Sequence, residues 1–327
     1  MKAAVARTMR RLIKLAAREV YRSAGWQDQM LLAGVSAAHG LRRLDRLQTL
    51  GDAEFQVFSQ WGEDGIIEWL VSRLPGIPES FVEFGVEDYR EANTRFLLRH
   101  RHWRGLVLDG APAKIASLRD DPVYWRHDLN AQSAFITRDN IDGLIAQNGF
   151  GGELGLLSID IDGNDYWVWQ AIGACRPWIV IAEYNAMFGD IQPLTIPYQA
   201  DFQRMAGHPS GLYYGASAPA LQQLGTQCGY SLVGSNRAGN DLFFVRNDVL
   251  ERLQGEIVDR TPRPSLFRDA RAADGTLLHV GGIDRLALIQ DLPVRDLASG
   301  QDRPLRECGR LFSDRWLELM GAAAPRP

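Results

Sequence analysis

The chain has 327 residues, of which 46% are apolar and 23% are charged, and these proportions are typical of a globular protein. They exclude a disordered chain, a collagen-like fibre and a repeat array, and no apolar run reaches the ~20 residues that span a bilayer. The net charge of −4 conceals an asymmetry. Residues 1–46 hold ten Lys or Arg against three acids and therefore carry +7, which leaves −11 for the remainder.

The first 22 residues carry a regular basic pattern. Apolar side chains there follow the same three- or four-residue period as the bases Arg7, Arg11, Lys14, Arg18 and Arg22. This spacing predicts a basic amphipathic helix within an N-terminal segment of residues 1–48. We expect the helix to pack on its own domain or on a second copy in a homodimer; contact with anionic membrane lipid or a polyanionic substrate is the alternative. The acidic body argues against nucleic acid as a partner.

Cysteine usage and the first bases bear on the compartment. Cys175, Cys228 and Cys308 are widely spaced and predict neither a disulfide framework nor a metal knuckle, which is typical of a reducing compartment. A secretory signal needs an uninterrupted apolar stretch, and the bases within residues 10–14 break it. The sequence therefore predicts a cytoplasmic protein, peripheral to the membrane if the basic helix binds lipid.

Short apolar runs alternate with helical stretches through residues 49–250, the predicted α/β domain. Nearly continuous apolar strands separated by helices predict a mostly parallel sheet with helices on both faces. The parallel strands are expected at 81–86, 105–110, 154–162 and 178–184. A turn-rich linker between 230–233 and 241–245 predicts a C-terminal antiparallel hairpin. Residues 251–327 break into short pieces and are expected to form a small C-terminal extension.

Polar residues stand where the predicted strands end: Glu83, Gly85, Asp109, Asp160, Asp162 and Glu183. In open α/β sheets, ligands bind outside the carboxyl ends of the strands. A glycine after the first strand lets backbone approach a ligand closely, and an acid at the end of the next strand can accept hydrogen bonds from two ribose hydroxyls. No pyrophosphate-binding glycine run is present, so the pattern favours an adenosine-type ligand without a pyrophosphate.

The segment DIDGND at residues 160–165 concentrates carboxylates. Asp160 and Asp162 are two apart in a strand and are expected to project to the same side. Together with Asp165 and Glu183 they form a candidate oxygen-ligand set for Mg²⁺, since converging carboxylates repel each other unless a cation or a proton relieves them. The alternative is that Asp162 or Asp165 caps the following helix.

These segments together resemble the FkbM-like branch of S-adenosylmethionine-dependent methyltransferases over about residues 55–248. The motifs that carry the resemblance are SQWGEDG (59–65), FVEFGVED (81–88), NTR (93–95), WRGLVLDG (103–110), SIDIDGNDY (158–166), IAEYN (181–185) and YGAS (214–217). The resemblance implies a Rossmann-like class I methyltransferase fold with S-adenosylmethionine as cofactor. As a set the motifs are specific for the family, but they do not specify an acceptor.

The resemblance also implies roles for individual residues. Glu83 and Gly85 would line the methionine end of the cofactor, and Asp109 would hold the ribose. Asp128 would follow a further strand, expected between 105–110 and 154–162, and would face the adenine. Asp160 and Asp162 would lie beside the sulfonium.

One position departs from the family pattern. Tyr89 stands where members with a fuller glycine motif have a glycine, and its side chain is expected to narrow the cofactor cleft.

Methyl transfer to a hydroxyl needs a group that takes the hydroxyl proton. His208, on a loop-like stretch at 207–211, is the best basic candidate, and a loop histidine with one backbone contact is the alternative. The predicted function is therefore O-methylation of a sugar or glycoconjugate hydroxyl on a small-molecule or glycan acceptor, with His208, Asp160 and Asp162 as catalytic candidates. Two other functions stay open: a glycosyltransferase that uses Asp160-Ile161-Asp162 as a metal-binding DxD triplet, and a catalytically inactive methyltransferase-fold binding module.

Overall fold

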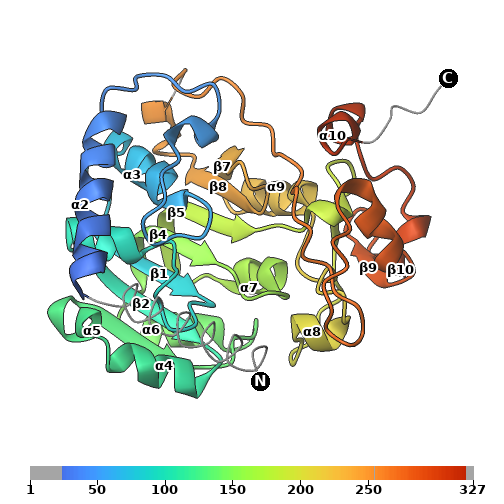
Figure 1. Cartoon of the computed structure of the whole chain (residues 1–327), viewed down its shortest axis with the longest axis horizontal. Coiled ribbons are helices and arrows are strands. Elements are labelled where there is room, and N and C mark those ends of the chain that lie inside the picture. The colour runs from blue at the N-terminus through green and yellow to red at the C-terminus, as the bar shows by residue number, and fades with distance from the viewer. Residues whose placement is uncertain (1–23, 254, 322–327) are drawn as a thin grey trace, which may run out of the picture.

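The computed structural model describes residues 24–253 and 255–321 (Figure 1). The predicted basic helix at 1–22, with the lipid or second copy expected to contact it, lies outside the described residues. The helix α2 (Ala24–Leu41) follows that segment and packs on the body, with Ala38 buried beside Val57 and Phe96. None of the helices in the described ranges combines the length and the apolar character that a membrane span requires.

A seven-stranded sheet in the order β3-β2-β1-β4-β5-β8-β7 forms the centre of the molecule. Its strands are β1 (Ser80–Phe84), β2 (Arg104–Asp109), β3 (Leu129–Ser133), β4 (Gly152–Ile159), β5 (Cys175–Glu183), β7 (Tyr230–Ser235) and β8 (Asp241–Arg246). The first five are parallel, whereas β8 runs antiparallel to both β5 and β7. The predicted hairpin is therefore present at the edge of the sheet.

Helices cover both faces of this sheet because its strands are apolar on both sides. Phe81 and Val107 point into one core and Val82 and Leu106 into the other. The first core is covered by α3 (Glu63–Arg73), α4 (Pro112–Arg119) and α5 (Pro122–Arg126), and the second by α6 (Ile141–Gln147), α7 (Asp165–Ala171) and α9 (Ala218–Gln227). The predicted fold class, an α/β fold with a mostly parallel sheet, a C-terminal antiparallel hairpin strand and helices on both faces, is confirmed.

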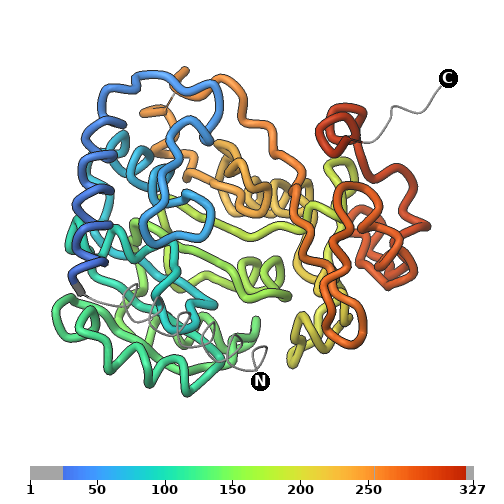
Figure 2. The backbone as a smooth tube through the Cα atoms, in the orientation of Figure 1, coloured from blue at the N-terminus to red at the C-terminus, as the bar shows by residue number. Residues whose placement is uncertain are grey.

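A second, three-stranded antiparallel sheet joins two distant parts of the chain. It has the order β10-β9-β6 and consists of β6 (Leu194–Thr195), β9 (Pro293–Asp296) and β10 (Gln301–Pro304). Figure 2 shows the orange and red segment lying beside the yellow segment that contains α8 (Arg204–Gly207). Trp316, in α10 (Asp314–Leu319), is fully buried in the core that also holds β4 and β5. The C-terminal region thus shares a sheet and a core with the predicted α/β domain.

Short helical turns connect these elements. They are η1 (Leu50–Ala53), η2 (Leu97–Arg101), η3 (Ala186–Phe188), η4 (Leu250–Leu253), η5 (Gly282–Leu288) and η6 (Leu305–Glu307). The η2 turn is a π-helix, and the others have 3-10 geometry.

Candidate functional site

Two adjoining cavities lie at the carboxyl ends of the parallel strands. The first, of about 390 Å³, lies between the ends of β1, β2 and β4 and the α8 segment and is here called the first cavity. The second, of about 450 Å³, extends toward the ends of β5 and β8 and is called the acidic cavity. Both are lined by Gly85, Glu87, Asp160, Asp162 and Arg204, so the two spaces share a boundary. Their position is the one at which open α/β sheets bind ligands.

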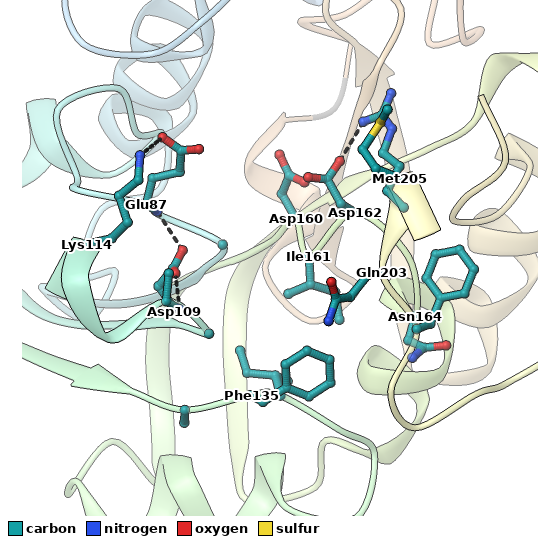
Figure 3. Close-up of a pocket in the computed structure, with 17 residues that line it drawn as sticks. Glu87, Asp109, Lys114, Phe135, Asp160, Ile161, Asp162, Asn164, Gln203 and Met205 are labelled. Carbon is teal, nitrogen blue, oxygen red and sulfur yellow. Dashed lines mark hydrogen bonds and ion pairs between the residues drawn. The ribbon is translucent and has the colours of Figure 1, made fainter. Parts of the chain in front are cut away.

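Asp109 ends β2 and is held in place by the backbone. Its Oδ2 accepts a hydrogen bond from the Glu87 amide at 2.7 Å, and its Oδ1 accepts one from the Ala111 amide at 2.7 Å. Figure 3 shows this carboxylate on one side of the first cavity, opposite Asp160. Because a carboxylate oxygen has two lone pairs, each oxygen of Asp109 retains an acceptor position for a ligand hydroxyl.

The first cavity also has apolar walls, which the sequence did not single out. Phe135 and Ile136 follow β3, Ile161 follows β4, and Phe202 comes from the α8 segment. Phe135 lies between the Asp109 side and the Asp160 side (Figure 3) and is 46% exposed. Apolar walls next to one oriented carboxylate suit a ligand with a flat aromatic part and a hydroxylated part.

The predicted position of Asp128 is wrong. Asp128 precedes β3, and the Arg104 Nε lies 3.9 Å from its Oδ2 at the start of β2. Its side chain is 74% exposed and does not line the first cavity. Residues 126–130 were taken to follow a strand, whereas the apolar positions Leu129 and Ala131 alternate within the strand itself. The residues that reach the cavity after β3 are Ala134, Phe135 and Ile136.

Glu83 is a buried acid that holds the loop after β1. Its Oε1 accepts a hydrogen bond from the Asn93 amide at 2.7 Å, and its Oε2 accepts bonds from the amide and the hydroxyl of Thr94. Burial raises the pKa of Glu83 to about 7 despite these bonds. Glu83 lines the acidic cavity, and a role at the methionine end of the cofactor stays a prediction.

Gly85 is required by the contact between two strand-end loops. It has φ +71, and a Cβ at this position would lie 1.7 Å from the Asp160 carbonyl oxygen. The glycine therefore allows the loop after β4 to approach the loop after β1. This contact places Asp160 at the boundary of the two cavities.

Tyr89 does not narrow either cavity. It has φ +59, is fully buried, and its hydroxyl forms a 2.8 Å hydrogen bond with the hydroxyl of Thr94. Its side chain belongs to the core beneath the loop and is not among the residues that line the two cavities. The expected obstruction is wrong because the Tyr89 ring packs inward, into the core, and not toward the strand ends.

Asp160 and Glu183 form a carboxyl pair at the ends of adjacent strands. Their side chains are within hydrogen-bond reach, and the Oε2 of Glu183 is buried without a hydrogen-bond partner. Burial, together with the neighbouring carboxylates, raises the pKa of both groups well above its usual range. Burial therefore favours the neutral form of both carboxyls, and a proton on one stabilises the charge on the other.

The four predicted metal ligands do not act alike. Oxygens of Asp160, Asp165 and Glu183 lie within 4.8 Å of one another, whereas Asp162 forms an ion pair with Arg204. The two oxygens of Asp165 accept bonds from the Ile161 and Gly163 amides at 2.8 and 2.9 Å. Burial raises the pKa of Asp165 to about 6. Asp165 thus holds the turn before α7 and does not cap the helix, whose N-cap is Asn164, so the capping alternative is wrong for Asp165. Mg²⁺ gains no support from Asp165, because both of its oxygens already accept hydrogen bonds from backbone amides.

Arg204 is the main site residue that the sequence did not indicate. Its Nη1 lies 2.5 Å from Asp162 Oδ1 and 3.9 Å from Glu183 Oε1, and its guanidinium carbon lies 3.7 Å from the Tyr214 ring centroid. Its Nε donates a hydrogen bond to the Gly211 carbonyl at 2.6 Å. Arg204 lies 42 positions beyond Asp162 in a four-residue helix, so no local spacing could reveal the pairing.

Replacing this cation should destabilise the site in a pH-dependent way. We expect Arg204→Gln to lower the free energy of unfolding by about 1–3 kcal/mol near pH 8, and by less near pH 5. At the lower pH, Asp160 and Glu183 hold more protons because their pKa values are raised, so less charge is left uncompensated. Urea unfolding at both pH values measures this, and an equal loss at both would contradict it.

Removing one acid of the pair should have the opposite effect. A carboxyl with a raised folded-state pKa binds more protons in the native state, so it reduces stability as the pH rises above its unfolded value. We expect Glu183→Gln to raise the free energy of unfolding by about 1–3 kcal/mol near pH 8 and to have little effect near pH 5. The exposed residue Glu251 provides a matched Glu→Gln control. Urea unfolding that shows no gain near pH 8 would refute this account of the pair.

His208 is not brought to the strand ends. It follows α8, and its Nδ1 forms a 2.8 Å hydrogen bond with the Ser210 hydroxyl. Partial burial lowers its pKa, and its side chain lines neither cavity. The structure thus matches the alternative of a loop histidine with a local contact, which is a correction to the catalytic assignment.

No protein-family model matches the sequence, and no curated protein matches it. Among solved structures, the N-terminal domain of EvdMO1 with SAH bound aligns at 11% identity with a TM-score of 0.39, covering 56% of this chain and 80% of that chain. An O-methyltransferase from Bacillus cereus in complex with SAH aligns at 12% identity with a TM-score of 0.38, covering 68% of this chain and 92% of that chain. A putative O-methyltransferase from Klebsiella pneumoniae aligns at 13% identity with a TM-score of 0.37, covering 66% of this chain and 90% of that chain. Likeness at this level assigns no activity to this chain, and the FkbM-like resemblance stays a prediction.

Proposed function

We propose that this protein is an S-adenosylmethionine-dependent methyltransferase that methylates a hydroxyl of a sugar or glycoconjugate. The observation that carries the cofactor assignment is Asp109, whose carboxylate is oriented by two backbone amides toward the first cavity. A volume of about 390 Å³ falls within the ~300–1,000 Å³ typical of small-molecule sites. The residues present therefore fit a nucleoside-type cofactor.

The residues of the first cavity divide the binding task. Asp109 would accept hydrogen bonds from the ribose hydroxyls, and Phe135 with Ile161 would contact the adenine. Lys114, whose Nζ lies 2.7 Å from Glu87 Oε2, would fix the loop after β1 at the rim. When bound, the cofactor supplies an activated methyl group.

The Asp160–Glu183 pair is the proposed proton acceptor in place of His208. A general base works best when its pKa is near the operating pH, and the raised pKa of this buried pair moves it in that direction. A carboxylate oxygen of Asp160 would accept the proton of the acceptor hydroxyl, and Glu183 would stabilise the protonated form by sharing it. Alignment of the acceptor hydroxyl with the activated methyl group would supply the larger part of the rate.

Calorimetric titration distinguishes the proposed function from its alternatives. We expect S-adenosylhomocysteine to bind with one site per chain and a UDP-sugar with Mn²⁺ to give no heat. Binding of the UDP-sugar alone would favour the DxD glycosyltransferase and refute the methyltransferase. If neither ligand binds, the result would favour the catalytically inactive binding module. An unchanged affinity for S-adenosylhomocysteine after addition of EDTA would argue against a structural Mg²⁺ at Asp160 and Asp162.

A further inference from the structure

We propose that the acidic cavity binds an acceptor that carries a protonated amine, such as an amino sugar. The inference deepens the proposed function and rests on it, since it assigns the first cavity to the cofactor and the acidic cavity to the acceptor. Among the described residues that line the acidic cavity, eight carry carboxyl groups and one, Arg204, carries a positive charge.

Four of these eight carboxyl groups are held by loop residues or by basic side chains at the rim. Glu83 is held by the loop amides of Asn93 and Thr94, and Glu91 by a hydrogen bond from the Gln60 side chain. The other two form ion pairs at the rim, Glu87 with Lys114 and Asp162 with Arg204. These four acids are therefore part of the fold of the strand-end loops.

The other four acids face one another in two pairs. Asp160 contacts Glu183, and the Asp241 carboxyl is within hydrogen-bond reach of the Glu63 carboxyl. The oxygens of Glu63 also accept hydrogen bonds from the Trp61 amide and the Asn236 side chain. The two pairs are neighbours, because Glu183 on β5 lies opposite Asp241 on β8 in the strand register. Glu183, Glu63 and Asp241 are 7%, 1% and 4% exposed and Asp160 is half-buried, so water has little access to three of the four carboxyls.

One atom of this set lacks a partner that the protein could have supplied. The Oε2 of Glu183 is buried and accepts no hydrogen bond, although Glu183 lines the cavity. A buried acceptor without a donor is costly, and such an atom in a native structure points to a missing ligand or ion. An ammonium group offers three donors and one positive charge, which matches one orphaned acceptor within a set of paired carboxyls.

The shape of the cavity favours an organic cation over a bound metal ion. A volume of about 450 Å³ exceeds the space of a single ion, and the two acid pairs belong to different strand ends. Asp165, the third member of the closest carboxylate group, directs both oxygens to backbone amides. At the rim, Trp61 is 42% exposed and stacks on Phe267 with ring centroids 4.9 Å apart. Its ring offers a flat apolar surface to the face of a sugar.

The test compares two sugars that differ in charge and little in shape. Protein saturated with S-adenosylhomocysteine is titrated near neutral pH with D-glucosamine and, separately, with N-acetyl-D-glucosamine. We expect D-glucosamine to bind at least about tenfold more tightly, because hydrogen bonds to buried charges are the stronger ones. Glu183→Gln and Asp241→Asn should bring the ratio of the two affinities close to one. Asp128→Asn, which removes an exposed acid outside the cavities, should leave the ratio unchanged.

Three results would overturn the inference. Equal affinity for the two sugars would show that the carboxyl pairs do not distinguish a charged amine from a neutral amide. If neither sugar binds, the acidic cavity is not the acceptor site. Tight binding of Mg²⁺ alone that Glu183→Gln abolishes would show a metal site instead. Titration with S-adenosylhomocysteine alone is done first, so a failure of the proposed function is seen separately: a preference for D-glucosamine without cofactor binding would refute the methyltransferase and leave the cation site.

Discussion

Asp109→Asn should weaken the binding of S-adenosylhomocysteine by about 30- to 1,000-fold, the equivalent of ~2–4 kcal/mol. The Asp109 carboxylate accepts hydrogen bonds from two backbone amides, and each of its oxygens retains one acceptor position for a ligand. An asparagine side chain has one oxygen, so its amide group must face either a backbone N–H or the ribose hydroxyls. Both arrangements remove a charge-assisted hydrogen bond, and calorimetry measures the loss.

A matched variant separates this effect from a change in net charge. Asp128→Asn also removes one negative charge, but Asp128 is exposed at the opposite ends of the strands and should leave the affinity unchanged. Urea unfolding of both variants shows whether the loops held by Asp109 stay folded. Wild-type affinity in a folded Asp109→Asn variant would remove the residue from the cofactor site.

Gly85→Ala should destabilise the protein by about 2–5 kcal/mol and abolish detectable cofactor binding. The new Cβ would lie 1.7 Å from the Asp160 carbonyl oxygen, and that atom belongs to the backbone. The loops after β1 and β4 must therefore separate, which displaces residues that line both cavities. Urea unfolding measures the loss of stability, and calorimetry measures the binding.

Gly76→Ala is the control for the backbone conformation alone. Gly76 has φ +82, close to the φ +71 of Gly85, but no atom lies within 4 Å of its added Cβ. We expect this variant to lose only ~1–2 kcal/mol, the cost of a left-handed conformation, and to bind the cofactor normally. Equal losses for the two variants would show that the contact between the loops contributes nothing.

The sequence indicated most strands of the sheet and the acids at their ends. Buried parallel strands are continuous apolar runs, so their ends are visible as the first polar residues, and this identified Asp109, Asp160 and Glu183. The third strand was misplaced because β3, with the sequence LNAQS, is short and only half apolar. That error placed Asp128 in the site and left Phe135 out.

Residues that reach the site from distant segments were not predictable in the same way. Arg204 lies in a four-residue helix, and Asp241 precedes the apolar residues of a hairpin strand; neither position has a periodic signal. Glu63, within the SQWGEDG motif, also lines the acidic cavity. His208 was favoured for its chemistry alone, and its position beside Ser210 depends on how the chain turns after α8. Tertiary packing, and not local sequence, decides which polar groups converge.

The most direct test of the central claim is a crystal structure of the protein with S-adenosylhomocysteine. We expect the ribose hydroxyls within hydrogen-bond distance of Asp109, the adenine between Phe135 and Ile161, and the sulfur directed toward Asp160 at the boundary with the acidic cavity. A ligand bound elsewhere, or a first cavity that stays empty at saturating ligand, would contradict the assignment of this fold to cofactor-dependent methyl transfer.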